Sequence, residues 1–172
     1  MIHEIVNVIL VNDDDFEIGC EEKFTAHKKG ALHRAFSIFV FNSKNLLLLQ
    51  KRATNKYHSG GLWSNTCCGH PQTGEDLLET ANKRLVEEMG FSCELEEITK
   101  FQYKAELDHN LIENEIDHIL VGRFDGIPEI NLSEASEYKW ISLKELSGDI
   151  KSNPDIYTFW LKKAIDKISL PK

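Results

Sequence analysis

Residues 69–91 have the sequence GHPQTGEDLLETANKRLVEEMGF, and this stretch decides the fold. Its apolar residues recur every four positions, at Leu77, Ala81, Leu85 and Met89. That spacing places them on one face of a helix, where they can pack against a core. A glycine at position 90 is a common helix terminator. We therefore predict an amphipathic helix over residues 76–89.

The residues immediately before this helix concentrate reactive side chains. Residues 63–75 have the sequence WSNTCCGHPQTGE, with two adjacent thiols and an imidazole. Gly69, Pro71 and Gly74 interrupt regular secondary structure here, which favours a rigid loop. We predict that this loop forms the wall of an active site and that the helix anchors it.

Composition is that of an ordinary globular protein. The chain has 172 residues, of which 41% are hydrophobic and 28% charged, enough for one core. We expect a single domain over residues 1–172. No segment approaches the roughly 20 apolar residues of a membrane helix, and the first residues lack a signal-peptide pattern, so we expect no membrane partner.

Cysteine spacing and net charge limit the cellular compartment and the partners that we expect. The cysteines at positions 20, 67, 68 and 93 form no regular disulfide framework, which favours free thiols and a cytoplasmic location. A net charge of -8 argues against a nucleic-acid partner, because nucleic-acid binding depends on clustered Lys and Arg. An anionic small substrate would need local cations or a metal ion.

The remaining elements are predicted from apolar runs and turn residues. We expect strands at residues 4–11, 35–41, 46–50, 101–105, 111–116 and 138–143, and a closing helix at 154–168. Residues 13–15 are three adjacent aspartates, but they lack the glycine and closing glutamate of a calcium loop. We expect a solvated turn there and exclude it from the site.

Several polar residues leave two interpretations open. His27 and His33 flank a glycine bend, so a loop could fold both imidazoles inward, although each alone is typical of a surface or core-edge histidine. The basic residues at 51–56 could bind an anionic group or could be ordinary surface charges. Glu113 and Glu115 share one face of a strand, where a buried pair would need protonation or a metal ion. Trp160 falls in a helical stripe and by spacing alone is a core anchor.

The stretch over residues 69–91 also resembles the Nudix box, whose helix presents glutamates to a divalent metal ion and a diphosphate. Glu75, Glu87 and Glu88 fall at matching positions. The Nudix hydrolase pattern has Arg-Glu where this chain has Lys83-Arg84. A cation therefore replaces a metal-binding carboxylate, which argues against diphosphate hydrolysis.

Three further motifs identify a family. The segments LHRAFS at 32–37, TCCGHP at 66–71 and ENE at 113–115, together with the Nudix-like helix, resemble type I isopentenyl-diphosphate isomerase over residues 23–160. The resemblance implies an α/β fold, a Nudix-like α/β/α sandwich with a mixed central sheet. It implies isomerisation of isopentenyl diphosphate to dimethylallyl diphosphate by metal-assisted protonation and deprotonation, in isoprenoid biosynthesis.

The resemblance also implies roles for individual residues. One divalent ion, Mn2+, Zn2+ or Mg2+, would be held by His27, His33, His70, Glu113 and Glu115. A second ion, Mg2+, would bridge Glu88 to the substrate diphosphate. The catalytic set would be Cys68, Glu115, Tyr103 and Trp160: Cys68 and Glu115 as the acid and base, Tyr103 orienting the acid, and Trp160 facing a cationic intermediate. The substrate-binding cations would be Lys23, Arg52, Lys56 and Arg84.

Two other classes of protein remain as alternatives. A Nudix hydrolase of a nucleoside diphosphate derivative would release phosphate, and a non-catalytic module would fold around metal without turnover. The module would usually carry closely spaced Cys pairs, whereas Cys67 and Cys68 are adjacent. We expect the isomerase, acting as a monomer on a prenyl diphosphate. His58, His109 and His118 lie outside the motifs, and we expect them to tolerate substitution.

Overall fold

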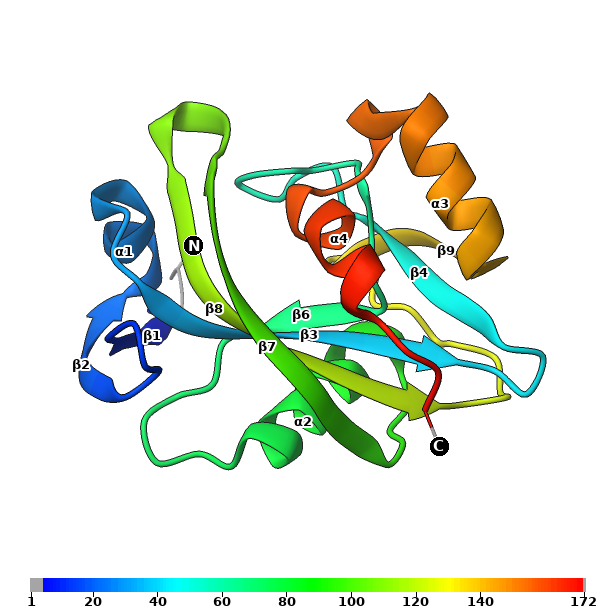
Figure 1. The fold of residues 1–172 in the computed structure, drawn as a ribbon, viewed down its shortest axis with the longest axis horizontal. Coiled ribbons are helices and arrows are strands. Elements are labelled where there is room, and N and C mark those ends of the chain that lie inside the picture. Colours follow the sequence, from blue (N-terminus) through cyan, green and yellow to red (C-terminus); the bar gives the residue numbers. More distant parts are fainter. Residues whose placement is uncertain (1–4, 172) are drawn as a thin grey trace.

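A computed structural model describes residues 5–171 of the chain (Figure 1). The strands are β1 Asn7–Val11, β2 Glu17–Glu22, β3 His33–Phe41, β4 Leu46–Arg52, β5 Trp63–Ser64, β6 Cys67–Gly69, β7 Leu95–Glu106, β8 Ile112–Arg123 and β9 Ala135–Ser142. The helices are α1 Lys23–Lys29, α2 Leu77–Met89, α3 Leu143–Ser152 and α4 Phe159–Ala164, with 3-10 turns at Asp108–Asn110, Pro154–Ile156 and Ile165–Lys167. No helix among the described residues is long and apolar enough to cross a membrane.

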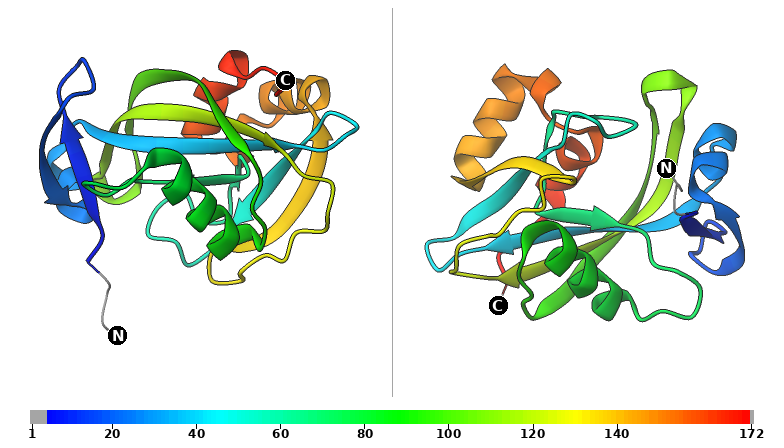
Figure 2. Two further views of the ribbon diagram at one scale, coloured as in Figure 1. Left: turned by 90° about the horizontal axis from the view of Figure 1, so that it is seen from below. Right: turned by 180° about the vertical axis from the view of Figure 1, so that it is seen from behind.

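All these strands belong to one mixed sheet. The order β2-β1-β3-β4-β5 forms its main path, β6 and β8 pair with β3, β7 pairs with β8, and β9 pairs with β4. The β3–β8 pair is parallel and the other strand pairs are antiparallel. Helix α2 lies on one side of the sheet, and α3 and α4 lie on the other (Figure 2). The predicted α/β/α sandwich with a mixed central sheet is confirmed.

Alternating side chains of β3 build two cores on opposite sides of the sheet. Phe36, Ile38 and Val40 pack with the apolar face of α2. Phe39 and Phe41 pack on the other side, against a core that includes Leu161 of α4. This period of two is what a strand covered on both faces requires. The site-bearing residues His33 and Ser37 share the α4 side.

Strand register brings distant residues of the sequence into one row. Glu115 of β8 pairs with His33 of the parallel strand β3 and with Tyr103 of the antiparallel strand β7. Directly paired residues point to the same face of a sheet. Four residues further along β3, Ser37 pairs with Cys68 of β6. The sheet therefore places side chains of four strands on the same face.

The predicted helix over residues 76–89 is confirmed. Asp76 is its N-cap, and its side chain accepts hydrogen bonds from the backbone N–H groups of Leu78 and Glu79 at 3.0 Å. Gly90 ends the helix with φ 77°, a left-handed conformation that favours glycine. The predicted strands also form, although β7 and β8 are longer than expected. The beginning of the strand predicted at 4–11 includes residue 4, which lies outside the described residues.

Three local predictions are wrong. The segment with His27 is a helix, α1, capped by the carboxylate of Glu22, and not a loop. Residues 154–168 form a short helix between two 3-10 turns, because Tyr157 and Thr158 are extended. Residues 63–75 are a loop only in part, since they contain β5 and β6.

The acidic turn after β1 also differs from its prediction. Asp13 and Asp14 are exposed, but the side chain of Asp15 is only 6% exposed. Its carboxylate lies 2.8 Å from Arg34 Nε and 2.8 Å from Lys100 Nζ. Burial alone would raise the pKa of Asp15, but these bonds outweigh it and lower that pKa. Asp15 therefore attaches the turn to the sheet.

Candidate active site

One cavity of about 600 Å³ collects the predicted site residues. It is lined in part by residues 35–37 of β3 and Arg52 of β4, two strands that pair, in the described part of the chain, only at Phe41 and Leu47. Its lining includes Lys23, Arg52, Lys56, Cys68, His70, Arg84, Glu88, Tyr103, Glu113, Glu115 and Trp160. The sequence motifs, which are far apart along the chain, thus contribute to the same cavity.

Three histidines and one glutamate form a compact donor group inside this region. One ligand atom from each of His27, His33, His70 and Glu115 lies within 4.8 Å of the others. Glu115 Oε1 is 2.9 Å from His70 Nε2 and 3.1 Å from His33 Nε2. Glu113, the fifth predicted ligand, lies on the same face of β8 but is not in this group of four atoms.

The other ring nitrogens of two of these histidines are already occupied. His27 Nδ1 is 3.0 Å from the hydroxyl of Tyr57, and His33 Nδ1 donates to the carbonyl of Ala31 at 2.9 Å. Such outer bonds fix the ring and direct Nε2 to a metal ion. Tyr57 was not identified from the sequence, because no motif contains it.

Two buried atoms indicate that the group fits a divalent cation. His27 Nε2 and Glu113 Oε2 have no hydrogen-bond partner among the described residues. Unpaired polar atoms are costly to bury, and a metal ion would satisfy both. Burial lowers the pKa of His27 to about 3 and that of His70 to about 4, so both imidazoles are neutral, as metal ligands must be.

The two carboxylates of β8 differ in charge. Burial and the adjacent Glu115 charge raise the pKa of Glu113 well above its usual range. Burial also opposes ionisation of Glu115, but hydrogen bonds from His33 and His70 outweigh it and hold its pKa well below the usual range. Tyr103 donates to Glu115 Oε2 at 2.8 Å. The sequence predicts that Tyr103 orients Cys68, whereas in the structure its hydroxyl bonds to Glu115.

The adjacent thiols lie in different environments. Cys67 is fully buried in the core beneath α2. Cys68 lines the cavity, 3.7 Å from the hydroxyl of Ser37, and burial raises the pKa of its thiol to about 12. The residue after Cys68 has no room for a side chain, because a Cβ on Gly69 would lie 2.6 Å from the ring of Phe36.

Asn65 connects the thiol to the predicted aromatic residue. Its amide nitrogen donates to the carbonyls of Ile38 at 3.0 Å and Cys67 at 2.9 Å, which fixes its orientation. Its oxygen then accepts from Cys68 Sγ and from Trp160 Nε1, both at 3.1 Å. Asn65 is fully buried and lies in the segment over residues 63–75, but no residue pattern there distinguishes it.

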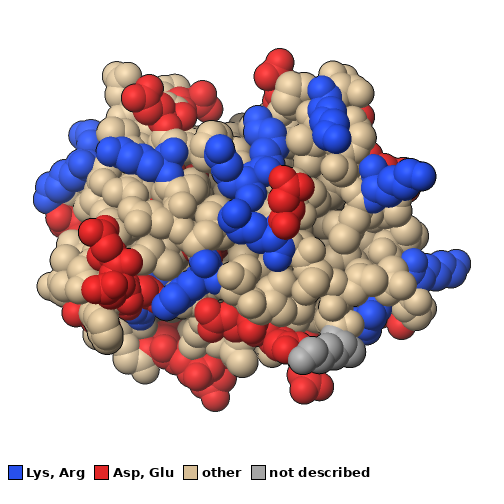
Figure 3. Space-filling view, viewed as in Figure 1, with Lys and Arg blue, Asp and Glu red and all other residues tan. Residues whose placement is uncertain are grey.

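The four predicted substrate-binding cations come from three regions. Lys23 begins α1, Arg52 ends β4, Lys56 follows it, and Arg84 lies on α2. The guanidinium of Arg52 lies 5.2 Å from the ring centroid of Trp160, so the charged and aromatic parts of the cavity are contiguous. On the face shown in Figure 3, Lys and Arg side chains are interspersed with Asp and Glu, and the cavity has the same mixture.

Glu88 is the predicted ligand of a second ion, and it is buried next to a cation. Its carboxylate pairs with Arg84 one helical turn away, and accepts from Gln50 Nε2 at 2.9 Å. Arg84 also contacts Glu87 at 2.7 Å. Arg84 therefore lines the cavity together with two carboxylates. Its position in the sequence is the one at which the Nudix hydrolase pattern has a glutamate.

Two of the histidines that lie outside the motifs are buried and have specific neighbours. His58 is 5% exposed, lines the cavity and lies edge-on to Trp160 with ring centroids 5.9 Å apart. His118 is buried on the opposite side of the sheet, 2.9 Å from Asp15 and 2.7 Å from Glu97. The structure gives no reason to expect that either tolerates substitution. His109 is exposed, as that expectation requires.

The fold and site together define the class of protein. A model of the NUDIX domain matches residues 31–161, more than half of the chain. The crystal structure of DR0079 from Deinococcus radiodurans superposes with a TM-score of 0.79, 17% identity, and coverage of 94% of this chain and 98% of that one. The MutT protein from Methanosarcina mazei gives a TM-score of 0.65 with 20% identity, over 79% and 91% of the two chains. At such identities, these two similarities indicate the fold alone.

Closer relatives identify the branch within that class. Isopentenyl-diphosphate Delta-isomerase 2 of Photorhabdus laumondii is 55% identical over 94% of this chain and 92% of its own. The isopentenyl-diphosphate Delta-isomerase of Serratia proteamaculans is 50% identical over 89% of this chain and 86% of its own. The chain belongs to the isopentenyl-diphosphate Delta-isomerases of the NUDIX family.

Proposed function

We propose that this chain, as a single Nudix-like domain, converts isopentenyl diphosphate to dimethylallyl diphosphate. The observation that carries the proposal is that the Cys68 thiol and the Glu115 carboxylate line the same cavity. Burial raises the pKa of Cys68 to about 12, and hydrogen bonds lower the pKa of Glu115. An acid and a base already in these states suit a reaction that adds one proton and removes another.

The proton balance assigns a role to each group. Cys68 gives its proton to the terminal alkene carbon and becomes a thiolate, which leaves a tertiary cation on the substrate. Glu115 then takes a proton from the carbon next to the diphosphate-bearing carbon, and the electrons of that C–H bond form the new alkene. Tyr103 holds Glu115 by its 2.8 Å hydrogen bond, so Tyr103 orients the base.

The cation requires a dry, electron-rich surrounding. The indole of Trp160 offers an aromatic face to the cavity, and such faces attract cations. Hydrogen bonds from its Nε1 to Ser64 at 2.9 Å and Asn65 at 3.1 Å fix the ring. Residues of α1 and the β4–β5 connection flank this region and would exclude water, which would otherwise trap the cation as an alcohol.

Metal ions complete the site. His27, His33, His70 and Glu115, with the buried oxygen of Glu113, would hold one divalent ion, Mn2+, Zn2+ or Mg2+. When bound, the ion would neutralise the two carboxylates and tune the basicity of Glu115. Glu88 would contribute to a second site, for Mg2+ bridging to the diphosphate, and Lys23, Arg52, Lys56 and Arg84 would contact the diphosphate.

One assay separates this function from diphosphate hydrolysis. Purified protein with isopentenyl diphosphate and Mg2+ should give dimethylallyl diphosphate, detected by proton NMR, without release of phosphate. In deuterated water the product should gain deuterium at the new methyl group, because the acid exchanges with solvent. Release of phosphate without isomerised product would favour the hydrolase, and bound metal without either product would favour the non-catalytic module.

A further inference from the structure

Glu134 lies in the cavity wall and belongs to none of the sequence motifs. Its backbone is fixed from two directions. Its N–H donates to Asn131 O at 2.8 Å, and Asn131 N–H donates to Glu88 O at the end of α2, at 2.9 Å. Its carbonyl accepts from Ala53 N–H, after β4, at 2.9 Å. The position of Glu134 is therefore determined by α2, which carries Arg84, and by the segment after β4, which contains Lys56.

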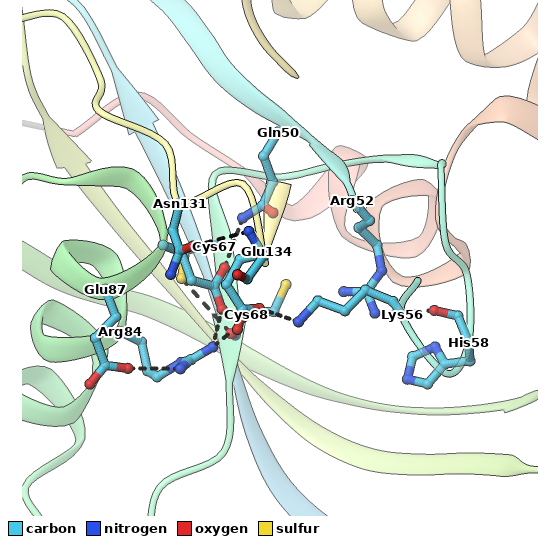
Figure 4. Close-up of polar contacts among 12 residues, drawn as sticks. Gln50, Arg52, Lys56, His58, Cys67, Cys68, Arg84, Glu87, Asn131 and Glu134 are labelled. Carbon is cyan, nitrogen blue, oxygen red and sulfur yellow. Dashed lines mark hydrogen bonds and ion pairs between the residues drawn. The ribbon is translucent and has the colours of Figure 1, made fainter. Parts of the chain in front are cut away.

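The carboxylate of Glu134 lies between these two cations. Its Oε2 pairs with Lys56 Nζ and is 3.8 Å from Arg84 Nη2. Figure 4 shows Lys56 and Arg84 reaching it from opposite sides. The side chains of Lys56 and Glu134 are 25% and 22% exposed, so their interaction is less screened than that of a fully exposed pair.

Arg84 does not require Glu134 for its orientation. Its guanidinium already contacts Glu87 at 2.7 Å and pairs with Glu88. A carboxylate added to an arginine that already has two carboxylate partners does little to position it. It does add a negative charge at the place where a diphosphate would bind.

The positive and negative charges of the whole cavity are nearly balanced. Its wall contains five basic and six acidic side chains: Lys23, Arg52, Lys56, Lys83 and Arg84, with Glu75, Glu87, Glu88, Glu113, Glu115 and Glu134. Burial holds one of the acidic ones, Glu113, toward its neutral form. A site built only to maximise affinity for a polyanion would have an excess of positive charge. This one approaches neutrality, and Glu134 is the carboxylate that takes a lysine away from the substrate.

We infer that Glu134 is an internal competitor of the diphosphate, a counter-anion that holds Lys56 and Arg84 until a diphosphate displaces it. The inference rests on the proposed diphosphate-binding role of these two cations. Glu134 lowers the affinity of the site for a diphosphate that arrives without metal, and it returns to the cations when the product leaves. It is an affinity-determining residue and takes no part in proton transfer.

Calorimetric titration with inorganic pyrophosphate, without added magnesium, tests this inference independently of turnover. Glu134→Gln should bind pyrophosphate about fivefold more tightly than the wild type, the scale of one partly exposed charge contact. Glu134→Ala should act in the same direction. The gain should diminish at high salt, because salt screens the carboxylate that the variants remove.

Glu137→Gln is the matched control. Glu137 pairs with Lys51 at 2.7 Å across β4 and β9, but neither residue lines the cavity in the described part of the chain. This variant removes the same charge and should leave pyrophosphate affinity unchanged. A tighter Glu134→Gln variant cannot be explained by structural damage, since damage to a binding site weakens it.

The possible results distinguish the two proposals. If Glu134→Gln and Glu134→Ala bind pyrophosphate as weakly as the wild type or more weakly, Glu134 serves to position the cations and the inference is wrong. If both bind more tightly while the wild type fails to isomerise isopentenyl diphosphate, the inference holds and the proposed reaction is wrong. An equal gain in pyrophosphate affinity in Glu137→Gln would show that the effect depends only on the net charge of the protein, and it would also overturn the inference.

Discussion

Tyr103 Oη donates a 2.8 Å hydrogen bond to Glu115 Oε2, while the other oxygen of Glu115 faces His70 and His33. The two oxygens thus have different partners, one a phenol and the other two imidazoles. Register explains the arrangement, because Tyr103 and Glu115 are directly paired residues of β7 and β8. A carboxylate held in this way has a fixed direction in the cavity.

Replacing Tyr103 by Phe tests this hydrogen bond. The variant keeps the ring that packs with Trp160 and loses only the donor, so the base should become less well oriented. We expect kcat to fall by roughly 10- to 100-fold, the effect typical of losing a partner of a metal-site carboxylate. KM should change little. Tyr138→Phe is the control, since Tyr138 is exposed on β9, and it should keep wild-type kinetics.

Replacing His70 by Asn tests the metal centre. The side chain loses Nε2, which lies 2.9 Å from Glu115 within the four-atom donor group. We expect loss of the bound transition metal in elemental analysis and loss of most activity, with the fold retained in circular dichroism. His109→Asn changes an exposed histidine and should keep both metal and activity. Equal metal content in the two variants would remove His70 from the site.

The sequence predicts those features of the site that depend only on residues close together in the chain. The helix over residues 76–89 follows from its apolar spacing, and the shared face of Glu113 and Glu115 follows from the period of a strand. The row of Tyr103, Glu115 and His33 could not be predicted in the same way, because it depends on the register of strands far apart in the chain.

Tertiary contacts also overrode local signals. Asp15 lies in a run of aspartates that is typical of a solvated turn, yet Arg34 and Lys100 bury its side chain. Tyr157 and Thr158 interrupt the predicted closing helix, and Thr158 N–H donates instead to Trp63 O at 2.9 Å. Asn65 and Glu134 carry no distinctive spacing, so their roles become visible only when their partners are known.

His58 should make stability depend on pH. Burial lowers its pKa from 6.5 to about 2 in the folded protein. As pH falls below 6.5 the unfolded chain takes up a proton that the folded protein does not, so the free energy of unfolding falls. At about pH 5 the loss from this one group is about 2 kcal/mol. Burial also lowers the pKa of His27 and His70, which contribute with the same sign.

Urea unfolding of chelator-treated protein at about pH 7 and about pH 5 measures this dependence. His58→Gln should lose less stability on acidification than the wild type, because glutamine does not titrate. His109→Gln, at an exposed position, should keep the wild-type difference. The same loss in His58→Gln and in the wild type would contradict the burial of a neutral imidazole at this position.

The adjacent cysteines should respond in opposite ways to substitution. Cys68 lines the cavity, and its S–H donates to Asn65 Oδ1 at 3.1 Å, so Cys68→Ala should abolish isomerisation while the protein stays folded. Cys67 is fully buried in the core beneath α2, so Cys67→Ala leaves a small void and should cost about 1 kcal/mol of stability. Its turnover should remain close to that of the wild type.

An epoxide analogue of the substrate gives a second, chemical readout of the same assignment. Proton donation opens the epoxide to an alcohol, and the thiolate left on the donor can attack the epoxide carbon to form a C–S bond. Mass spectrometry of the digested protein should therefore find the adduct on Cys68, one residue before Gly69, and Cys68→Ala should stay unlabelled. An adduct on Cys67 would mean that the strand β6 presents the other thiol to the substrate, because side chains of consecutive strand residues point to opposite faces.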